Sequence, residues 1–269
     1  YVSANERASS EFLSNLIFPS YESRNVELYE RSDVAIEEGY VYASSILTGS
    51  YGKNTAIAPP SDIDILFKLP SSYFNRYDNH LGNGQSRLLQ DVKHVLEQAY
   101  PRTDIRADGQ VVVVPFNSYR VEVLPAFETP SGKYLYPDTH NGGSWKVTDP
   151  KAEKQQLLDS NKRAKGNTIR LIKMIKAWKQ HCTVPIASLV IELRSVHFLN
   201  SWQYYDKGFF FYDWMIRDYF SELLKYVNGT CPMPGTDEKK AYGDQWKSKA
   251  ETAARISKKA CECEEAKHT

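Results

Sequence analysis

Residues 49–69 read GSYGKNTAIAPPSDIDILFKL, and this stretch determines how the rest of the chain is interpreted. Its second half alternates and is rich in branched residues, which predicts a strand over Asp62–Leu69. Asp62 and Asp64 then point to the same face of that strand, because successive side chains alternate. Two like charges side by side repel each other, and a divalent cation between them removes the repulsion. The pattern therefore predicts a metal-binding strand.

A turn of small residues comes before this strand. Gly49 and Ser50 follow a predicted strand over 46–48. A glycine there lets backbone N–H groups approach a phosphate closely, and Ser50 adds a hydroxyl donor. Alone, a Gly-Ser turn is a weak signal, and a lone D-x-D strand is more often a solvated edge. In this order, the two together favour a phosphate site next to a metal site.

A third carboxylate is predicted on a later strand. In the segment RVEVL, Glu122 is flanked by Val121 and Val123, so its side chain leaves the sheet on the face opposite to the two valines. Three carboxylates on neighbouring strands can hold two Mg²⁺ about 3.5–4 Å apart, which activate an attacking oxygen and stabilise a leaving oxygen. We therefore interpret Asp62, Asp64 and Glu122 as catalytic metal ligands.

A basic ridge lies in the second half of the chain. Residues 167–181, NTIRLIKMIKAWKQH, are predicted to form a helix on which cations recur at i+3 spacing. The cations are Arg170, Lys173, Lys176 and Lys179. For Lys173 and Lys176 a triphosphate contact and a solvated face explain the pattern equally well, whereas we interpret Lys179 as solvated. Ser188 opens the next predicted helix, where a phosphate would be favoured, although capping or packing serines are commoner.

Composition narrows the class of protein. The chain has 269 residues, of which 41% are hydrophobic and 25% charged, close to a soluble globular average. It has no run of about 18 apolar residues, which argues against a membrane span. The opening YVSANERASS lacks the apolar region of a signal peptide, so we expect a cytoplasmic protein. A formal net charge of +1 argues against a general nucleic-acid binder.

Hydrophobic periodicity predicts an α+β protein. In the first half, we expect helices over 1–17, 26–45 and 85–99, strands over 46–48, 62–69, 103–106, 110–115 and 119–124, and loops over 71–84 and 128–149. In the second half, we expect helices over 151–159, 161–181, 186–199, 210–227 and 241–266, and a linker over 229–237. This predicts a sheet lobe over 1–150 with a helical spine at its start, a helical lobe over 151–269, and a ligand cleft between the lobes.

The sequence suggests more than one role for two groups of residues, the aromatic residues of one segment and the cysteines. Tyr134, Tyr136 and Trp145 lie in the expected loop over 128–149, where they could stack a base or pack in the core. The four cysteines show no zinc-site spacing, and we interpret them as reduced thiols. They are Cys182, Cys231, Cys261 and Cys263.

Several of these segments together resemble a known family. GSYGKNTAIAPPSDIDILFKL resembles the signature of the oligoadenylate synthetase and cGAS-like branch of the polymerase-beta nucleotidyltransferases. VEVLPAFE resembles that branch's third-carboxylate strand, and IRLIKMIKAWKQHC with IASLVIEL resembles its paired helices. GGSWKVTDP and the Ala-rich last helix resemble the bacterial members, the CD-NTases of anti-phage signalling. The resemblance covers roughly residues 40–200.

This resemblance implies a fold, an activity and a set of site residues. The fold would be two-lobed and polymerase-beta-like, and the activity would be synthesis of a cyclic di- or trinucleotide from NTPs, with ATP among them. Gly49 and Ser50 would grip the NTP phosphates, Lys176 would contact the donor triphosphate, and Ser188 would contact the nucleotide. Asp62, Asp64 and Glu122 would bind two Mg²⁺, with Mn²⁺ as the alternative ion. The family pattern has Asp where this chain has Glu122.

The resemblance also bears on partners and on rival functions. Members that sense nucleic acid carry a zinc cluster or a strongly basic groove, and this sequence shows neither pattern. We therefore expect no obligatory nucleic-acid activator, no membrane partner, and an effector reached through the soluble product. The rivals are a nucleotidyltransferase that modifies RNA ends, protein or a small molecule such as an antibiotic, and a degenerate scaffold that only binds nucleotide or a partner protein.

Overall fold

The computed structural model describes residues 45–58, 62–117 and 119–265, which form two compact units. The first unit holds the described residues up to Lys53 and from Ala58 to Pro150, and the second holds Asn54–Ile57 and everything from Lys151 onward. The chain therefore enters the second unit for four residues, Asn54–Ile57, before it returns to the first. The helices expected over 1–17 and over most of 26–45 lie outside the described residues.

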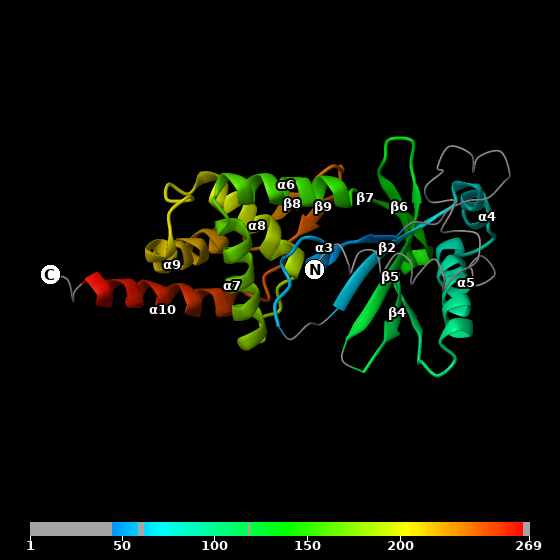
Figure 1. Cartoon of the computed structure of the whole chain (residues 1–269), viewed down its shortest axis with the longest axis horizontal. Coiled ribbons are helices and arrows are strands. Elements are labelled where there is room, and N and C mark those ends of the chain that lie inside the picture. The colour runs from blue at the N-terminus through cyan, green and yellow to red at the C-terminus, as the bar shows by residue number, and fades with distance from the viewer. Residues whose placement is uncertain (1–44, 59–61, 118, 266–269) are drawn as a thin grey trace, which may run out of the picture. The chain divides into compact units, whose positions relative to one another are not determined.

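A mixed seven-stranded sheet forms the first unit (Figure 1). Its main path runs β1-β2-β5-β4-β3, and β6 and β7 continue from the far end of β5. The strands are β1 Ser45–Leu47, β2 Asp62–Leu69, β3 Arg106–Asp108, β4 Val111–Pro115, β5 Arg120–Glu128, β6 Tyr134–Asp138 and β7 Ser144–Thr148. Strands β2 and β5 are parallel, and every other pair is antiparallel.

Helix α5, Gly84–Ala99, covers one face of this sheet (Figure 1). Its buried residues Leu88, Leu89, Val92 and Leu96 pack against the sheet residues that point the same way. Those sheet residues include Ile63, Ile65 and Phe67 of β2 and Val121, Val123 and Phe127 of β5. Because side chains alternate along a strand, the residues between them point to the opposite face. Asp62, Asp64 and Glu122 are thereby placed away from α5.

The fold class and several elements agree with the sequence prediction. Strand β2 has the predicted bounds, Asp62–Leu69, and α5 begins one residue earlier than expected, at Gly84. The turn expected after β1 is a single helical turn, α3, Gly49–Gly52. The prediction for 71–84 was incomplete, because this loop contains a 3₁₀ turn, Ser71–Tyr73, and the short helix α4, Phe74–Asp78.

The expectation of an irregular segment over 128–149 was wrong. This segment contains the hairpin of β6 and β7, joined by a 3₁₀ turn over His140–Gly142. Its prolines and glycines led to the wrong prediction, yet Gly142 and Gly143 lie in the tight connection, where both have positive φ angles. Pro137 lies on β6 opposite Trp145 of β7. The third expected strand, 103–106, is shifted and forms β3, Arg106–Asp108.

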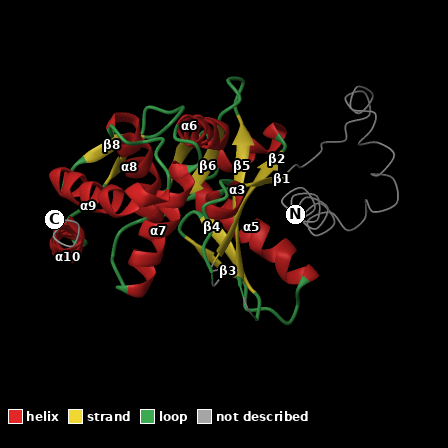
Figure 2. Ribbon diagram, turned by 60° about the vertical axis from the view of Figure 1, so that its left-hand side comes forward, coloured by secondary structure: helices red, strands yellow, loops and turns green. Residues whose placement is uncertain are grey.

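Five main helices build the second unit (Figure 2). They are α6 Pro150–Arg163, α7 Asn167–His181, α8 Ser188–Ser201, α9 Tyr212–Leu223 and α10 Lys247–Glu265. Short 3₁₀ turns flank α9 at Phe209–Phe211 and Leu224–Tyr226. The linker expected over 229–237 instead begins a small hairpin, in which β8 Thr230–Pro232 pairs with β9 Lys239–Ala241. The described residues contain no helix that is both long enough and apolar enough to span a membrane.

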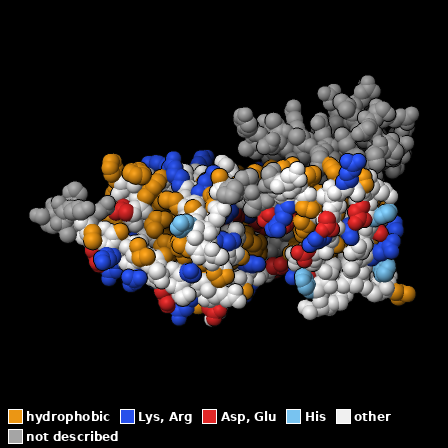
Figure 3. Space-filling view, turned by 90° about the horizontal axis from the view of Figure 1, so that it is seen from below, with side chains coloured by type: hydrophobic (Ala, Val, Ile, Leu, Met, Phe, Trp, Pro, Cys, Tyr) orange, Lys and Arg blue, Asp and Glu red, His pale blue; other side chains and the backbone are white. Residues whose placement is uncertain are grey.

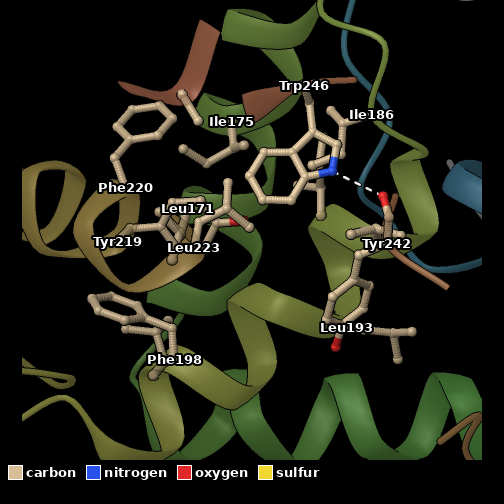
Figure 4. Packing of buried hydrophobic residues seen from close by; sticks show 14 of the residues in the cluster. Leu171, Ile175, Ile186, Leu193, Phe198, Tyr219, Phe220, Leu223, Tyr242 and Trp246 are labelled. Atoms are coloured by element: carbon tan, nitrogen blue, oxygen red, sulfur yellow. Dashed lines mark hydrogen bonds between the residues drawn. The ribbon is translucent and has the colours of Figure 1, made fainter. Parts of the chain in front are cut away.

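The core of the second unit is aromatic and centred on Trp246 (Figure 4). Trp246 is fully buried, and its Nε1 donates to the carbonyl of Tyr242 at 2.8 Å. Leu171 and Ile175 bring α7 into this core, and Tyr219, Phe220 and Leu223 bring α9. Trp246 lies directly before α10, and Ala250 of that helix is also buried. None of the four cysteines forms a disulfide.

Candidate active site

The parallel register of β2 and β5 aligns the three predicted carboxylates. Asp64 lies opposite Glu122, and Asp62 lies opposite Arg120. Neighbouring strands are about 4.8 Å apart, so the side chains of a register pair on one face are close neighbours. All three acidic side chains are half-buried on the face away from α5. The structure therefore brings Asp62, Asp64 and Glu122 together at one edge of this face.

The phosphate turn lies directly against this group of carboxylates. The backbone N–H of Thr48 donates to the carbonyl of Asp64 at 2.9 Å, and its hydroxyl donates to the same oxygen at 3.2 Å. A Cβ added to Gly49 would lie 1.7 Å from Oδ2 of Asp64. Gly49 also has a φ angle of +55°, which disfavours other residues. Glycine is therefore required at position 49, and Ser50 follows it in α3.

Arg120 is the counter-charge that the sequence analysis missed. Its Nε lies 2.6 Å from Oδ1 of Asp62 and 3.3 Å from Oε1 of Glu122, and its Nη2 donates to Oδ2 of Asp62 at 3.0 Å. Asp62 is thus held by two nitrogens of one guanidinium, a strong geometry for such a pair. The sequence did contain a signal for this residue: Arg120 lies two residues before Glu122 on one strand, so both side chains face the same side of the sheet.

Electrostatic repulsion persists within the group despite Arg120. Burial raises the pKa of Glu122, and the neighbouring charges of Asp64 and Asp62 raise it further, while Arg120 lowers it. A raised carboxyl pKa means that the ionised form is disfavoured where it stands. A cation bound at this position would relieve that cost.

The three carboxylates fit a divalent cation in the chemistry of their donor atoms. Carboxylate oxygens are the ligands that Mg²⁺ prefers, and the Asp64 carboxylate lies directly against Gly49, where any side chain would collide with it. Among the described residues, no three acidic, His or Cys side chains already converge on a single point. Arg120 bonds to Asp62 and Glu122 and so holds two of the three carboxylates. Metal binding would thus require these bonds to loosen.

Among the predicted site residues of the second unit, Lys176 is buried, whereas Lys173 and Ser188 are half-buried. Lys176 is 6% exposed, and its Nζ lies 2.6 Å from Oε1 of Glu192 and 2.8 Å from the hydroxyl of Thr55. Two of the three ammonium hydrogens are therefore engaged within the protein. Its contact with a triphosphate remains a prediction. Lys173 lies one turn earlier on α7 and is half-buried.

Lys179 is less exposed to solvent than the sequence analysis predicted. Its side chain is half-buried, and its Nζ donates to Oγ of Ser188 at 3.0 Å. The reason is the short connection between α7 and α8, in which Val184 and Ile186 are buried and turn the chain back. The end of α7 and the start of α8 consequently meet. Sequence spacing along one helix could not reveal this contact.

The aromatic residues whose role was left open pack in the first unit. Tyr134 is 2% exposed and lies in a small cluster with Leu66 and Ala126, against which Tyr136 also packs. The indole of Trp145 lies 5.1 Å from the ring of Phe74 and 5.7 Å from that of Phe127. Its Nε1 donates to Asp78 at 2.9 Å. These contacts correspond to core packing.

A mixed sheet with acidic residues on two adjacent parallel strands, preceded by a Gly-Ser turn, is the polymerase-beta-like nucleotidyltransferase fold. The family model of the Second Messenger Oligonucleotide or Dinucleotide Synthetase domain matches residues 11–161. The chain belongs to this family, which places it among the bacterial cGAS-like nucleotidyltransferases.

Individual relatives agree with this assignment. The chain is 29% identical over 140 residues to the cyclic AMP-AMP-AMP synthase of an Acinetobacter species, covering 52% of this chain and 40% of that protein. It is 23% identical over 198 residues to a probable cyclic nucleotide synthase of Bacillus cereus, covering 61% and 60%. The chain thus spans about half the length of these relatives.

Solved structures show the same fold. DncV of Vibrio cholerae, a cyclic AMP-GMP synthase solved with nonhydrolysable GTP, superposes with a TM-score of 0.65 at 16% identity. The superposition covers 87% of this chain and 68% of that one.

Proposed function

We propose that this chain is the catalytic part of a magnesium-dependent nucleotidyltransferase that makes a cyclic di- or trinucleotide second messenger from NTPs. One observation carries the proposal: Asp64 and Glu122 lie in register on parallel strands beside Asp62, with Gly49 against the Asp64 carboxylate. The family assignment supports it, as do the names of the relatives, which are synthases of cyclic nucleotides.

The residues of the first unit would divide the work of one transfer. Asp62, Asp64 and Glu122 would hold two Mg²⁺, or Mn²⁺ as the alternative, which supply charge neutralisation and activation of the attacking hydroxyl. Backbone N–H groups at Gly49 and the hydroxyl of Ser50 would bind the phosphates. The bond between the α-phosphorus and the departing pyrophosphate breaks as a bond to the hydroxyl of the second nucleotide forms. Catalysis then rests mainly on positioning and charge stabilisation.

The second unit would supply further phosphate contacts. Lys173, Lys176 and Ser188 are the predicted contributors. The bond from Lys179 to Ser188 adds a fourth candidate, because it places an ammonium group beside a hydroxyl at the start of α8. After one transfer, the linear product carries a triphosphate at one end and a free hydroxyl at the other. If it turns round, a second transfer closes the ring as an intramolecular step, which high effective molarity favours.

Charge distribution separates this proposal from a primer-dependent enzyme. A primer strand is held through many phosphate contacts, which calls for an extended basic surface. The formal net charge is only +1, and on the face shown in Figure 3 the Lys and Arg side chains are interspersed with Asp and Glu. This supports a site for small nucleotides, with no obligatory nucleic-acid activator. A soluble messenger would then act on a separate effector, as in anti-phage signalling.

Product analysis tests the proposal directly. The purified protein, incubated with Mg²⁺ and the four NTPs, is expected to release pyrophosphate and to yield an oligonucleotide that alkaline phosphatase cannot shorten, because a ring has no terminal phosphate. Mass spectrometry then gives its bases and ring size. A product that phosphatase degrades fully, or activity that requires an RNA primer, would favour an end-modifying transferase. Binding of Mg-NTP in calorimetry without pyrophosphate release would favour a binding scaffold.

A further inference from the structure

Three buried polar side chains of the second unit are bonded to one another. Thr55 is 0% exposed, Lys176 6% and Glu192 5%. The hydroxyl of Thr55 donates to Oε1 of Glu192 at 2.7 Å, and Nζ of Lys176 donates to the same hydroxyl at 2.8 Å. Lys176 and Glu192 close the triangle at 2.6 Å. Lys176 belongs to α7 and Glu192 to α8, while Thr55 comes from a segment more than a hundred residues earlier in the sequence.

Each member of this triangle depends on the others. Charged groups away from water are tolerated when they are paired and hydrogen-bonded, and losing one partner is costly. The Thr55 hydroxyl has a single hydrogen, which goes to Glu192, and one of its lone pairs accepts from Lys176. Its orientation is thereby fixed. A valine at position 55 would have the same shape but would leave both charged groups short of a partner.

Thr55 lies in the chain between the phosphate turn and the carboxylate strand, so the triangle is relevant to the active site as well as to stability. Helix α3 with the phosphate turn ends at Gly52, and the carboxylate strand β2 begins at Asp62. Between them the chain enters the second unit for residues Asn54–Ile57 and then returns to the first. Asn54, where it enters, has a φ angle of +55°. Thr55 is the buried residue of this short excursion.

We infer that Lys176 and Glu192 form a clamp on Thr55 that restrains the chain segment connecting the phosphate turn to the carboxylate strand. Lys176 is in this sense a positioning residue, which acts through Thr55. The inference rests on the proposed function for its catalytic consequence, whereas the clamp itself is a property of the folded chain. It deepens the proposal by giving Lys176 a defined role in addition to its predicted contact with a triphosphate.

Hydrogen exchange of peptides spanning residues 54–57 tests the clamp without reference to activity. Thr55→Val is expected to raise exchange in this segment at least about fivefold, since a buried hydrogen bond to charged groups is lost. Thr55→Ser keeps the hydroxyl and should exchange as the wild type does. Thr168→Val is the matched control. Thr168 lies on the same helix as Lys176, is also fully buried, and its hydroxyl bonds to that of Ser160.

The results separate a clamp from a general loss of stability. Faster exchange at residues 54–57 in Thr55→Val, with Thr168→Val unchanged there, supports the clamp. Wild-type exchange in Thr55→Val, or an equal rise in Thr168→Val, overturns it.

A double variant protects the test against misfolding. Lys176→Met with Glu192→Met removes both charges together, so that neither is left unpaired. It is expected to raise exchange at residues 54–57 as Thr55→Val does, and adding Thr55→Val to it should change nothing more, because coupled residues are not additive. Additive effects would contradict a shared clamp.

Kinetics then tests the catalytic consequence. Thr55→Val should lower kcat by about tenfold or more through misplacement of the reacting groups, and Thr55→Ser should restore it. A kcat unchanged in Thr55→Val, despite faster exchange, would show that the clamp does not position the site. Failure of the wild type to release pyrophosphate would instead refute the proposed function, and the exchange results would still judge the clamp.

Discussion

The carboxylate group of the first unit and the clamp of the second unit manage charge in opposite ways. Asp62, Asp64 and Glu122 are half-buried; Arg120 bonds to two of them, and the charges of Asp64 and Asp62 still raise the pKa of Glu122. Lys176 and Glu192 are buried and balance each other one to one. Excess charge within reach of solvent is available to a ligand, whereas balanced charge away from water holds the fold. Substitutions in the two groups should therefore have different consequences for activity and for stability.

Asp64→Asn, and likewise Asp62→Asn, should abolish turnover and leave the fold intact. Each carboxylate acts through a metal that contributes several kcal/mol of transition-state stabilisation, so pyrophosphate release should fall by at least about a thousandfold. Circular dichroism should match the wild type, because an asparagine has the same shape as the aspartate that it replaces. Near-normal pyrophosphate release in either variant would refute the assignment of the metal ligands.

Lys176→Ala should show the opposite behaviour, with a loss of stability first. It leaves the Glu192 carboxylate buried without its cation, which is expected to cost about 3–5 kcal/mol. Urea unfolding at neutral pH measures this directly. Lys179→Ala is the matched control on the same helix, because Lys179 is only half-buried whereas Lys176 is 6% exposed. Equal destabilisation by the two substitutions would erase the contrast between balanced and excess charge.

Gly49→Ala should disable the site through steric conflict. The new Cβ would lie 1.7 Å from Oδ2 of Asp64, so either the turn or the carboxylate must move. A displacement of about 1 Å at reacting groups can cost about a hundredfold in rate. Gly132→Ala is the control, because Gly132 also has a positive φ angle, +77°, but open space around its Cβ position. If both variants lose the same activity, backbone strain alone explains the requirement for glycine.

The contrast between local and distant features also explains what the sequence could predict. Alternation fixed the bounds of β2, and parity placed Glu122 opposite to Val121 and Val123, because both depend only on neighbours in the chain. The hairpin of β6 and β7 was missed, since turn-forming residues outweighed its short alternating runs. Thr55, which bonds to Lys176, and Asp62, which bonds to Arg120, lie far from these partners in sequence. Such pairs depend on register and packing, which a pattern within one segment does not contain.

Glu122→Gln should make the metal-free protein more stable at neutral pH. The pKa of Glu122 lies above its usual value of 4.5, mainly through burial and then through Asp64 and Asp62. A carboxyl whose pKa is raised on folding destabilises the native state once it ionises, so the wild type loses this stability as pH rises above the usual carboxyl range. The melting temperature of the variant in EDTA should exceed that of the wild type at pH 7, and the two should converge on acidification. A difference that persists when both are neutral would point to packing.

Arg120→Gln should tighten binding of Mg²⁺, which is the smallest effect expected here. Arg120 neutralises Asp62 and approaches Glu122, so it competes with a cation for the same oxygens. Its side chain is 53% exposed, and exposed ion pairs are worth about 0.2–1 kcal/mol, which corresponds to a gain of at most about fivefold in affinity. Calorimetric titration with Mg²⁺ at constant ionic strength measures the change, and Arg120→Lys should lie between the variant and the wild type because it keeps the charge without the two-nitrogen geometry. Weaker Mg²⁺ binding in Arg120→Gln would mean that the guanidinium organises the carboxylates for the metal, and the excess of negative charge would no longer distinguish this group from the buried clamp.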